Sequence, residues 1–206
     1  MTGGLMRKWV AGGLAAALLT LGAPGAAQSY SDGYKFLQAV EKKDRAEFDA
    51  LIAENHTVVN SRDLSNGRTG LHIAVERRDL VWLNYLISHD ANPNVADNKG
   101  VTPLMRASQL GFFEGVQNLA LAGARVDDPN GTGETPLILA VHRGDTQMMR
   151  VLLRAGANPD RTDNSGRSAR DYAEIDGRNS LTLAELERSA KPGSQAQASA
   201  EVYGPR

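Results

Sequence analysis

The sequence predicts an all-α solenoid of about five stacked helix–turn–helix units. Two observations support this fold class. Glycines recur every 33 residues, at Gly67, Gly100, Gly133 and Gly166, and a threonine or serine and an alanine recur at the same interval. Between them, apolar residues lie three and four positions apart, which is the spacing of amphipathic helices. A period that holds over four successive units is the usual sign of a repeat architecture.

The first 27 residues are predicted to be a secretory signal peptide. Arg7 and Lys8 form a basic start, an apolar run of 14 residues follows from Trp9 to Gly22, and small residues stand at Gly25 and Ala27. The alternative is an uncleaved anchor, but a membrane-spanning helix needs about 20 apolar residues. We therefore expect export, with a mature N-terminus near Gln28.

Residues 28–63 are predicted to form an N-terminal capping unit. They contain two helical patterns but lack the threonine–proline–leucine start of the later units, and the loop that follows is two residues longer. Its inward side chains are expected to be Phe36, Leu37, Val40, Phe48, Leu51 and Ile52.

Residues 64–163 are predicted to hold three full units. In each, threonine precedes a helix whose amides it can cap, and Pro103 and Pro136 occupy the first helical position, where no amide bond is lost. Leucine and alanine then share one face of that short helix. A second helix ends in Gly123-Ala124 or Gly156-Ala157, which suits a left-handed cap. Asp90 takes the place of this glycine in the first full unit.

Residues 164–190 are predicted to form a C-terminal capping unit, because Gly166, Ser168 and Ala173 keep the period. Arg170 and Asp171 replace the apolar and histidine positions, which suits an end unit with one wet side. Residues 191–206 are polar and small, and we expect this tail to be disordered.

Composition excludes several classes of function. The chain of 206 residues has no cysteine, so disulfides, thiolate zinc sites and catalytic thiols are excluded. Its net charge of −1 would become about −3 without residues 1–27, which does not suit a nucleic-acid binder. No catalytic or phosphate-binding motif is present, and His56, His72, His89 and His142 do not form a metal-ligand pattern. We predict no enzyme activity, no metal and no cofactor.

The segments that start at Gly67, Lys99 and Gly133 resemble the ankyrin repeat, with its Thr-Pro-Leu-His-x-Ala pattern and period of 33. The resemblance covers about residues 31–188. It implies L-shaped units with hairpin-like loops and a concave surface, made by those loops and the inner helices, that binds another protein. It also implies that His72 bonds the backbone of a neighbouring loop.

The register of the resemblance implies which residues contact the partner. They lie at loop tips and on the exposed side of the inner helices, although solvated surface is the alternative for each: Arg68, Glu76, Arg77, Lys99, Val101, Gln109, Leu110, Phe112, Glu134, His142, Arg143 and Arg167.

Two features of this set suggest what the partner looks like. Arg68, Arg77, Lys99, Arg143 and Arg167 would line one side, which suits an acidic partner surface. Leu110 and Phe112 are apolar where other units are charged, so they are a candidate hot spot unless Phe112 folds back onto its unit. Trp82 is expected to pack between second helices instead.

The sequence therefore predicts a monomeric, non-catalytic protein-binding module that acts in the bacterial periplasm as an accessory or stabilising factor for another envelope protein. A secreted effector or inhibitor of a foreign protein is the alternative. The partner is expected to be a protein, with no nucleic acid and no membrane insertion after cleavage.

Overall fold

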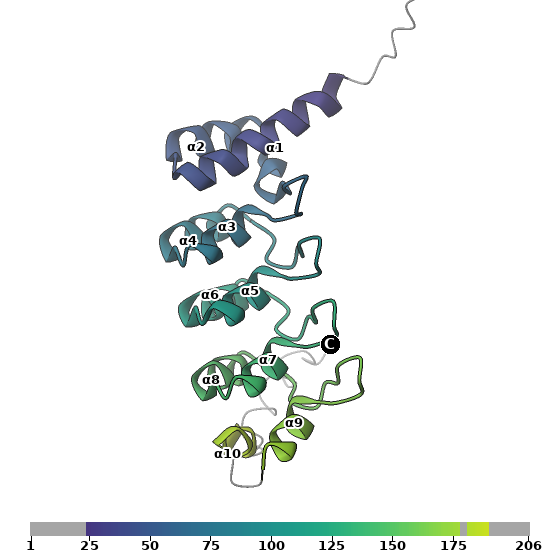
Figure 1. Ribbon diagram of the computed structural model, residues 1–206. Coiled ribbons are helices and arrows are strands. Elements are labelled where there is room, and N and C mark those ends of the chain that lie inside the picture. The colour runs from purple at the N-terminus through teal and green to yellow at the C-terminus, as the bar shows by residue number, and fades with distance from the viewer. Residues whose placement is uncertain (1–23, 178–180, 190–206) are drawn as a thin grey trace, which may run out of the picture.

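The computed structural model describes residues 24–177 and 181–189, and within them five pairs of helices stack in one column (Figure 1). The helices are α1 Pro24–Lys42, α2 Arg45–Glu54, α3 Gly70–Glu76, α4 Leu80–Ser88, α5 Pro103–Leu110, α6 Phe113–Leu121, α7 Pro136–His142, α8 Thr146–Arg154, α9 Ala169–Ile175 and α10 Leu181–Ser189. A short 3-10 helix, η1 at His56–Asn60, follows α2. The predicted all-α solenoid is confirmed.

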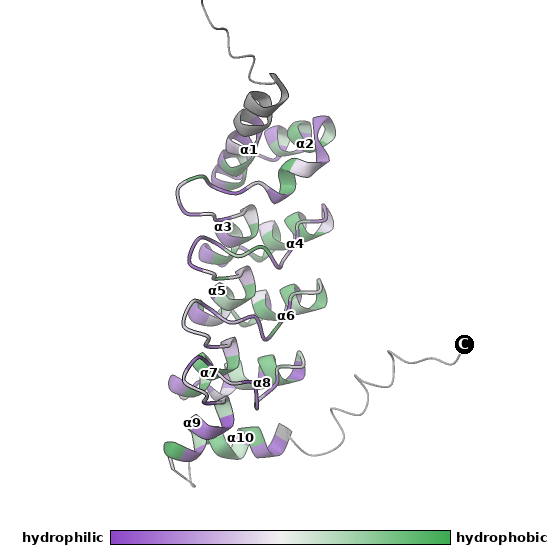
Figure 2. Ribbon diagram, turned by 90° about the vertical axis from the view of Figure 1, so that its right-hand side faces the viewer, coloured by the Kyte–Doolittle hydropathy of each residue, from purple (hydrophilic) through white to green (hydrophobic). Residues whose placement is uncertain are grey.

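The periodic leucines and alanines form the core between neighbouring units. Leu71, Leu104 and Leu137 are at most 1% exposed. The alanines at the next periodic position are buried as well, and the absence of a larger side chain lets α3, α5, α7 and α9 approach one another: Ala74, Ala107, Ala140 and Ala173. Figure 2 shows apolar segments facing between the layers, so each unit depends on its neighbours for burial.

Threonine and serine start the inner helices as the sequence predicts. The hydroxyls of Thr102 and Thr135 accept the backbone N–H of Met105 and Ile138. Ser168 does the same at α9, and there the Asp171 carboxylate accepts the Ser168 amide in return. Each start thereby satisfies amides that the helix itself leaves free.

Left-handed residues end the helices at matching places. Arg78, Gly111 and Gly144 follow the inner helices with φ of 50°, 66° and 62°. After the outer helices, Asp90 has φ of 61°, where Gly123 and Gly156 have 84° and 92°. The prediction that Asp90 occupies a left-handed position is confirmed.

The loops between units, which we call finger loops, project from one side of the stack (Figure 1). The ends of each loop are joined by a backbone hydrogen bond of 2.8–3.0 Å, from the amide of Asp63 to Arg68, Asp97 to Val101, Asn130 to Glu134 and Asp163 to Arg167, and the glycine amide within each loop donates back to the first of these residues. Within the described residues these loops form tight turns, and the one β-bridge joins Thr162 to Ser168. The hairpin-like shape is therefore reduced to a turn.

A ladder of side-chain bonds links the bases of successive loops. The side chain of Asn60 accepts the Asn92 amide at 2.7 Å, and that of Asn94 accepts the Arg125 amide at 2.8 Å. Asp127 accepts the Asn158 amide at 3.0 Å in the same way. Each rung joins only adjacent units, so the spacing of the loops is set locally.

The N-terminal unit buries the expected side chains, with Ile52 half-buried. The ring of Phe48 lies 5.2 Å from that of Phe36 and 5.6 Å from that of Trp82, which confirms that Trp82 packs between outer helices. His89 is half-buried, with its ring 5.2 Å from that of Phe48. The helix η1 was not predicted.

At the C-terminal end, Arg170 pairs with Asp160 at 2.7 Å, and the nearly buried Glu185 of α10 pairs with Arg150 at 2.9 Å. Charged residues at this end are therefore paired. Among the described residues no helix is long and apolar enough to cross a membrane. The predicted signal sequence up to residue 23 and the predicted tail from residue 191 lie outside the described residues.

Candidate functional site

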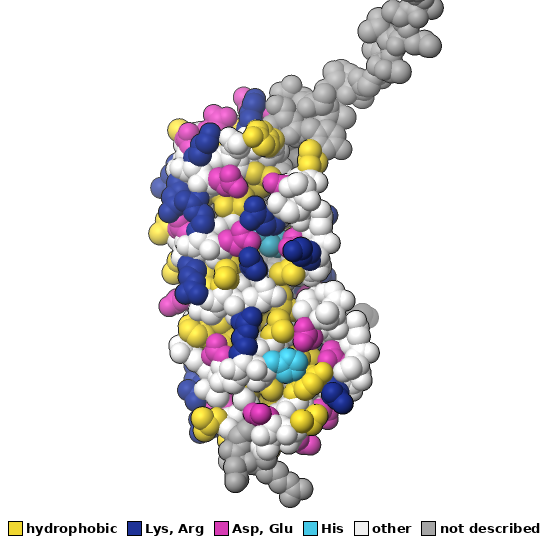
Figure 3. Space-filling view, in the orientation of Figure 1, with side chains coloured by type: hydrophobic (Ala, Val, Ile, Leu, Met, Phe, Trp, Pro, Cys, Tyr) yellow, Lys and Arg dark blue, Asp and Glu magenta, His cyan; other side chains and the backbone are white. Residues whose placement is uncertain are grey.

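The inner helices and the finger loops together form one face of the stack, which we call the groove face (Figure 3). The set of predicted contact residues divides by exposure. Arg77, Lys99, His142, Arg143 and Arg167 are exposed, and Arg68, Glu76, Val101, Gln109, Leu110 and Glu134 are half-buried. Phe112 is buried, so it has no part in this surface.

A charged cluster lies in the upper part of the groove face, on α3, α5 and the loop between residues 63 and 68. Glu76 accepts Arg68 Nη1 on one carboxylate oxygen and Arg106 Nη2, at 3.2 Å, on the other. Arg106 also donates to Gln109 at 3.4 Å. Two guanidinium groups thus share one carboxylate. Arg106 was missed in the sequence, although it stands where other units hold Ile73, Leu139 and Tyr172.

A second cluster, of the opposite sign, lies lower on the face. The Nδ1 atom of His142 is 3.6 Å from a carboxylate oxygen of Glu134, and its ring meets the edge of Tyr172 at 4.3 Å. The Tyr172 hydroxyl donates to Asp163 at 2.7 Å. Hydrogen bonds from Ser165 and from Tyr172 hold the pKa of Asp163 well below its usual range, so this carboxylate stays charged.

Hydrogen bonds within the protein engage several of the five cations that were predicted to line one side of the groove face. Arg77 donates to the carbonyl of Glu41, and Arg143 donates to the carbonyl of Gln109 at 2.7 Å. Arg78 donates in the opposite direction along the stack, to the carbonyl of Leu110 in the following unit. All three carbonyls lie in the last turn of the neighbouring inner helix or close to it, where a cation is favourable. Arg77 and Arg143 therefore tie neighbouring units together, and Lys99 and Arg167 are the freer cations of the row.

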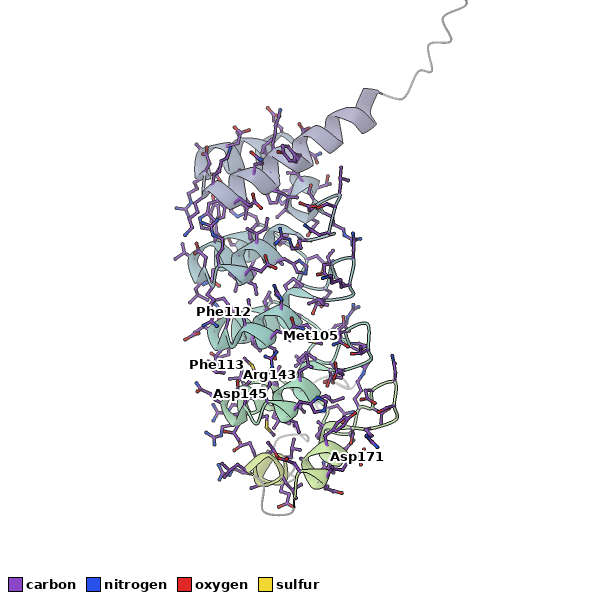
Figure 4. The ribbon with its side chains drawn as sticks, viewed as in Figure 1. Met105, Phe112, Phe113, Arg143, Asp145 and Asp171 are labelled. Carbon is purple, nitrogen blue, oxygen red and sulfur yellow. The ribbon has the colours of Figure 1, made fainter. Side chains whose placement is uncertain are left out.

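The predicted hot spot at Leu110 and Phe112 is wrong for Phe112, which is 6% exposed. Its ring lies over Gly115, and a Cβ atom at Gly115 would collide with it. Trp82 and Met148 hold the position of Gly115 in the units on either side. The ring therefore fills the space that a large side chain fills elsewhere. Figure 4 labels Phe112 in the layer formed by α5 and α6. Leu110 is half-buried against the core.

His72 has the structural role that the resemblance implies. It is 1% exposed, its Nδ1 lies 3.1 Å from the Thr69 amide, and its Nε2 lies 2.9 Å from the Val101 carbonyl. Nδ1 therefore accepts and Nε2 donates. Burial lowers the pKa of His72, although the Val101 carbonyl acts in the opposite direction. This neutral histidine joins α3 to the next finger loop.

A pocket of about 720 Å³ lies at the N-terminal end of the groove face. It is lined by α1, η1 and the first finger loop. Tyr34 and Leu64 on its wall are 65% and 82% exposed, and Leu37 and Val58 lie deeper. No periodic pattern in the sequence predicts this pocket, because it depends on the atypical first unit. Exposed apolar side chains around a hollow are typical of binding sites.

No group of three or more potential metal ligands occurs in the part of the chain that the structure describes. The acidic pair in the third finger loop is used within the fold. Asp127 accepts the Asn158 amide, and burial raises its pKa, whereas Asp128 pairs with Arg125 at 2.8 Å.

Comparison with known families agrees with this geometry. Two models described as ankyrin repeats match residues 36–130 and 119–173, which together make up more than half of the chain. The chain is an ankyrin repeat protein. The groove face is therefore made by the inner helices and finger loops of ankyrin repeats, and the family indicates a protein–protein interaction module.

Relatives share the repeats but not the length of the chain. An ankyrin repeat protein of fowlpox virus is 39% identical over 57 residues, 28% of this chain and 17% of its own. Mouse Rabankyrin-5 is 36% identical over 95 residues, 45% of this chain and 8% of its own. Human ankyrin repeat domain-containing protein 63 is 35% identical over 95 residues, 44% of this chain and 25% of its own. The ankyrin repeat chain matches a quarter or less of each.

Proposed function

We propose that this ankyrin repeat protein is exported to the bacterial periplasm and binds another envelope protein through its groove face, as a non-catalytic accessory or stabilising factor. The observation that carries the proposal is a continuous face on which charged and apolar side chains are left over from the packing of the stack. Arg68, Glu76 and Arg106 lie in its upper part, Glu134 and His142 lie lower, and Tyr34 borders the pocket at its end.

Affinity capture tests the binding proposal. The mature protein is immobilised, exposed to an envelope extract, and the captured proteins are identified by mass spectrometry. We expect one partner to be enriched over a control column that carries an unrelated repeat protein. A groove variant, Leu64→Asp, should reduce the yield because it places a charge beside the apolar pocket. An identical yield from both columns would contradict the proposal.

Export rests on residues 1–27 and has its own test. N-terminal sequencing of protein made in the source organism should find Gln28 first, and cell fractionation should recover it in the periplasm. The helix α1 begins at Pro24, so cleavage before Gln28 would remove the first four residues of this helix. A product that keeps Met1 would contradict export. Recovery from the medium instead would favour the alternative of a secreted effector or inhibitor.

A further inference from the structure

The charges of the upper groove cluster do not balance. Arg68 and Arg106 come from different units and meet at one carboxylate, that of Glu76. Each carboxylate oxygen of Glu76 is already engaged by one guanidinium group. Among these three side chains one positive charge is therefore left over, on arginines that are 30% and 39% exposed to solvent. The nearby carboxylates of Asp63 and Asp97 accept backbone amides of their own finger loops.

The two arginines also keep unused donors. A guanidinium group has five N–H donors in a planar fork, and it pairs best with a carboxylate when two of them are used together. Arg106 uses Nη2 for Glu76 and Nη1 for Gln109, and each of these nitrogens carries a second N–H group. Arg68 donates Nε to Asn66 at 3.2 Å and Nη1 to Glu76. Donors on both groups are thus free for a further oxygen ligand.

The stack itself does not need this cluster. At the position of Arg106, the units on either side hold Ile73 and Leu139. At the position of Arg68, the next two units hold Val101 and Glu134, and these units stack in the same way. Because the cluster is absent from units with the same packing, we assign it to recognition rather than to the fold.

The charged side chains around the cluster differ between the upper and the lower part of the groove face. Lys99 is exposed at the tip of the adjacent finger loop, which adds a third cation to the upper groove face. Lower on the face, Glu134 and Asp163 carry the opposite sign. Figure 3 shows Lys and Arg side chains over the upper and middle part of this face with Asp and Glu among them, and both signs again at its lower right. An acidic segment is attracted to the cations of the upper end, whereas at the lower end Glu134 and Asp163 lie near the exposed Arg167 and the charge is mixed.

We propose that Arg68, Arg106 and Lys99 form a binding site for the carboxylate of an acidic segment of a partner protein. Glu76 lies between the two guanidinium groups, and its carboxylate competes with that of the partner for them. The proposal rests on the proposed function, since it names the chemistry by which the groove face recognises its partner. It also fixes the orientation of the partner, whose acidic part lies over α3 and α5.

A labelled peptide of alternating glutamate and alanine tests the site directly, with the glutamine-for-glutamate peptide as its neutral counterpart. Fluorescence anisotropy at low salt measures both affinities. We expect the glutamate peptide to bind more tightly, and each of Arg106→Gln and Lys99→Gln to weaken it by roughly fivefold, as expected for one charge near contact in water. Glu76→Gln should strengthen binding by a similar factor, because it removes the competing negative charge.

Arg154→Gln is the matched control, since it removes the same charge from the exposed last turn of the outer helix α8. It should leave the affinity unchanged, and thermal melts should show that each variant is folded. Lys99→Gln, in an exposed loop, remains informative if Arg106→Gln does not fold. Equal affinity for the two peptides, equal weakening by Arg154→Gln and Lys99→Gln, or no gain from Glu76→Gln would overturn the site.

The capture experiment separates this site from the proposed function. If the unaltered protein captures a partner and Arg106→Gln and Lys99→Gln capture it equally well, the carboxylate site is wrong and the proposed function stands. If the unaltered protein captures no partner but discriminates between the two peptides as expected, the site stands and the periplasmic role is wrong.

Discussion

Asp90 shows how a single residue departs from the repeat at a measurable cost. It has a positive φ where the next two units use glycine, and a side chain in this conformation is strained. We expect Asp90→Gly to raise the free energy of unfolding by on the order of 0.5–1 kcal/mol. Chemical denaturation measures the change.

Gly123→Ala provides the reverse control for Asp90→Gly. A Cβ atom at Gly123 would meet no other atom within 4 Å, so the loss, about 1 kcal/mol, reports backbone strain alone. A destabilising Asp90→Gly beside a destabilising Gly123→Ala would mean that the Asp90 carboxylate makes a stabilising contact of its own.

His72 makes the stability depend on pH. Its pKa is lowered in the fold, mainly by burial, with Asp97 and Glu76 raising it and Arg68 lowering it. The folded state therefore binds fewer protons than the unfolded state, whose histidine has a pKa near 6.5. The contribution of His72 is complete above that pH and is lost as the pH falls through 6.5 toward the folded-state pKa.

We expect the denaturation midpoint to be lower at pH 5.5 than at pH 7.5. His72→Gln keeps an acceptor and a donor but does not titrate, so the difference between these two pH values should shrink. An unchanged difference in His72→Gln would mean that His72 is not its source; Asp127 would not account for it either, because a raised carboxyl pKa stabilises the fold as the pH falls.

Phe112 and Leu64 are a pair of apolar residues with opposite expected responses. Phe112→Ser should cost about 3–5 kcal/mol, since the ring is buried over Gly115 and its removal leaves a cavity. Leu64→Ser should change stability by less than about 0.5 kcal/mol, because Leu64 is 82% exposed. Thermal melts of the two variants compare them directly. Similar losses would mean that Leu64 is covered in solution.

At the scale of the helix, close approach of the inner helices depends on the alanine column. Ala107 is fully buried on α5, which packs between α3 and α7. Ala107→Glu forces a charge into this space and should cost on the order of several kcal/mol. Urea denaturation followed by circular dichroism measures it. Ala184→Glu, on an exposed position of α10, is the control and should be nearly neutral.

The helices could be predicted from the sequence because the residues that cap and pack them recur with a constant period. Caps, leucines and alanines recur, and the helices begin and end close to where these residues predict. The helix η1 and the pocket beside it could not be read, because the first unit does not keep the period. The shared carboxylate of Glu76 could not be read either, since pairing of long side chains across units depends on rotamers rather than on spacing.

Phe112 shows that the position of a residue within the repeat does not by itself decide whether its side chain is exposed. Its periodic counterparts are Asp79 and Asp145, which cap their helices from the surface, so exposure was the natural prediction. The deciding signal lay three residues later, in Gly115, whose missing side chain leaves room for a ring. Comparing two positions of the repeat together would have identified Phe112 as a core residue.

At the scale of the molecule, the end units protect the stack. The helices α9 and α10 pack on α7 and α8, and Glu185 is paired with Arg150. A chain that ends at residue 163 should lose several kcal/mol, roughly a 10 °C fall in Tm, and should bind a hydrophobic dye. A chain that ends at residue 190 is the control and should melt like the full chain. Equal melting of both would mean that α9 and α10 are not needed as a cap.

The ladder formed by Asn60, Asn94 and Asp127 has a mechanical consequence. Each of these three hydrogen bonds joins one loop to the next, and none of them reaches a more distant loop. The stack therefore deforms like a set of springs joined in series. A slight tilt at each joint is cheap, and tilts of the same sense accumulate toward the ends. The first and last layers can therefore swing together or apart around a bound object while every pair of neighbours keeps its contacts.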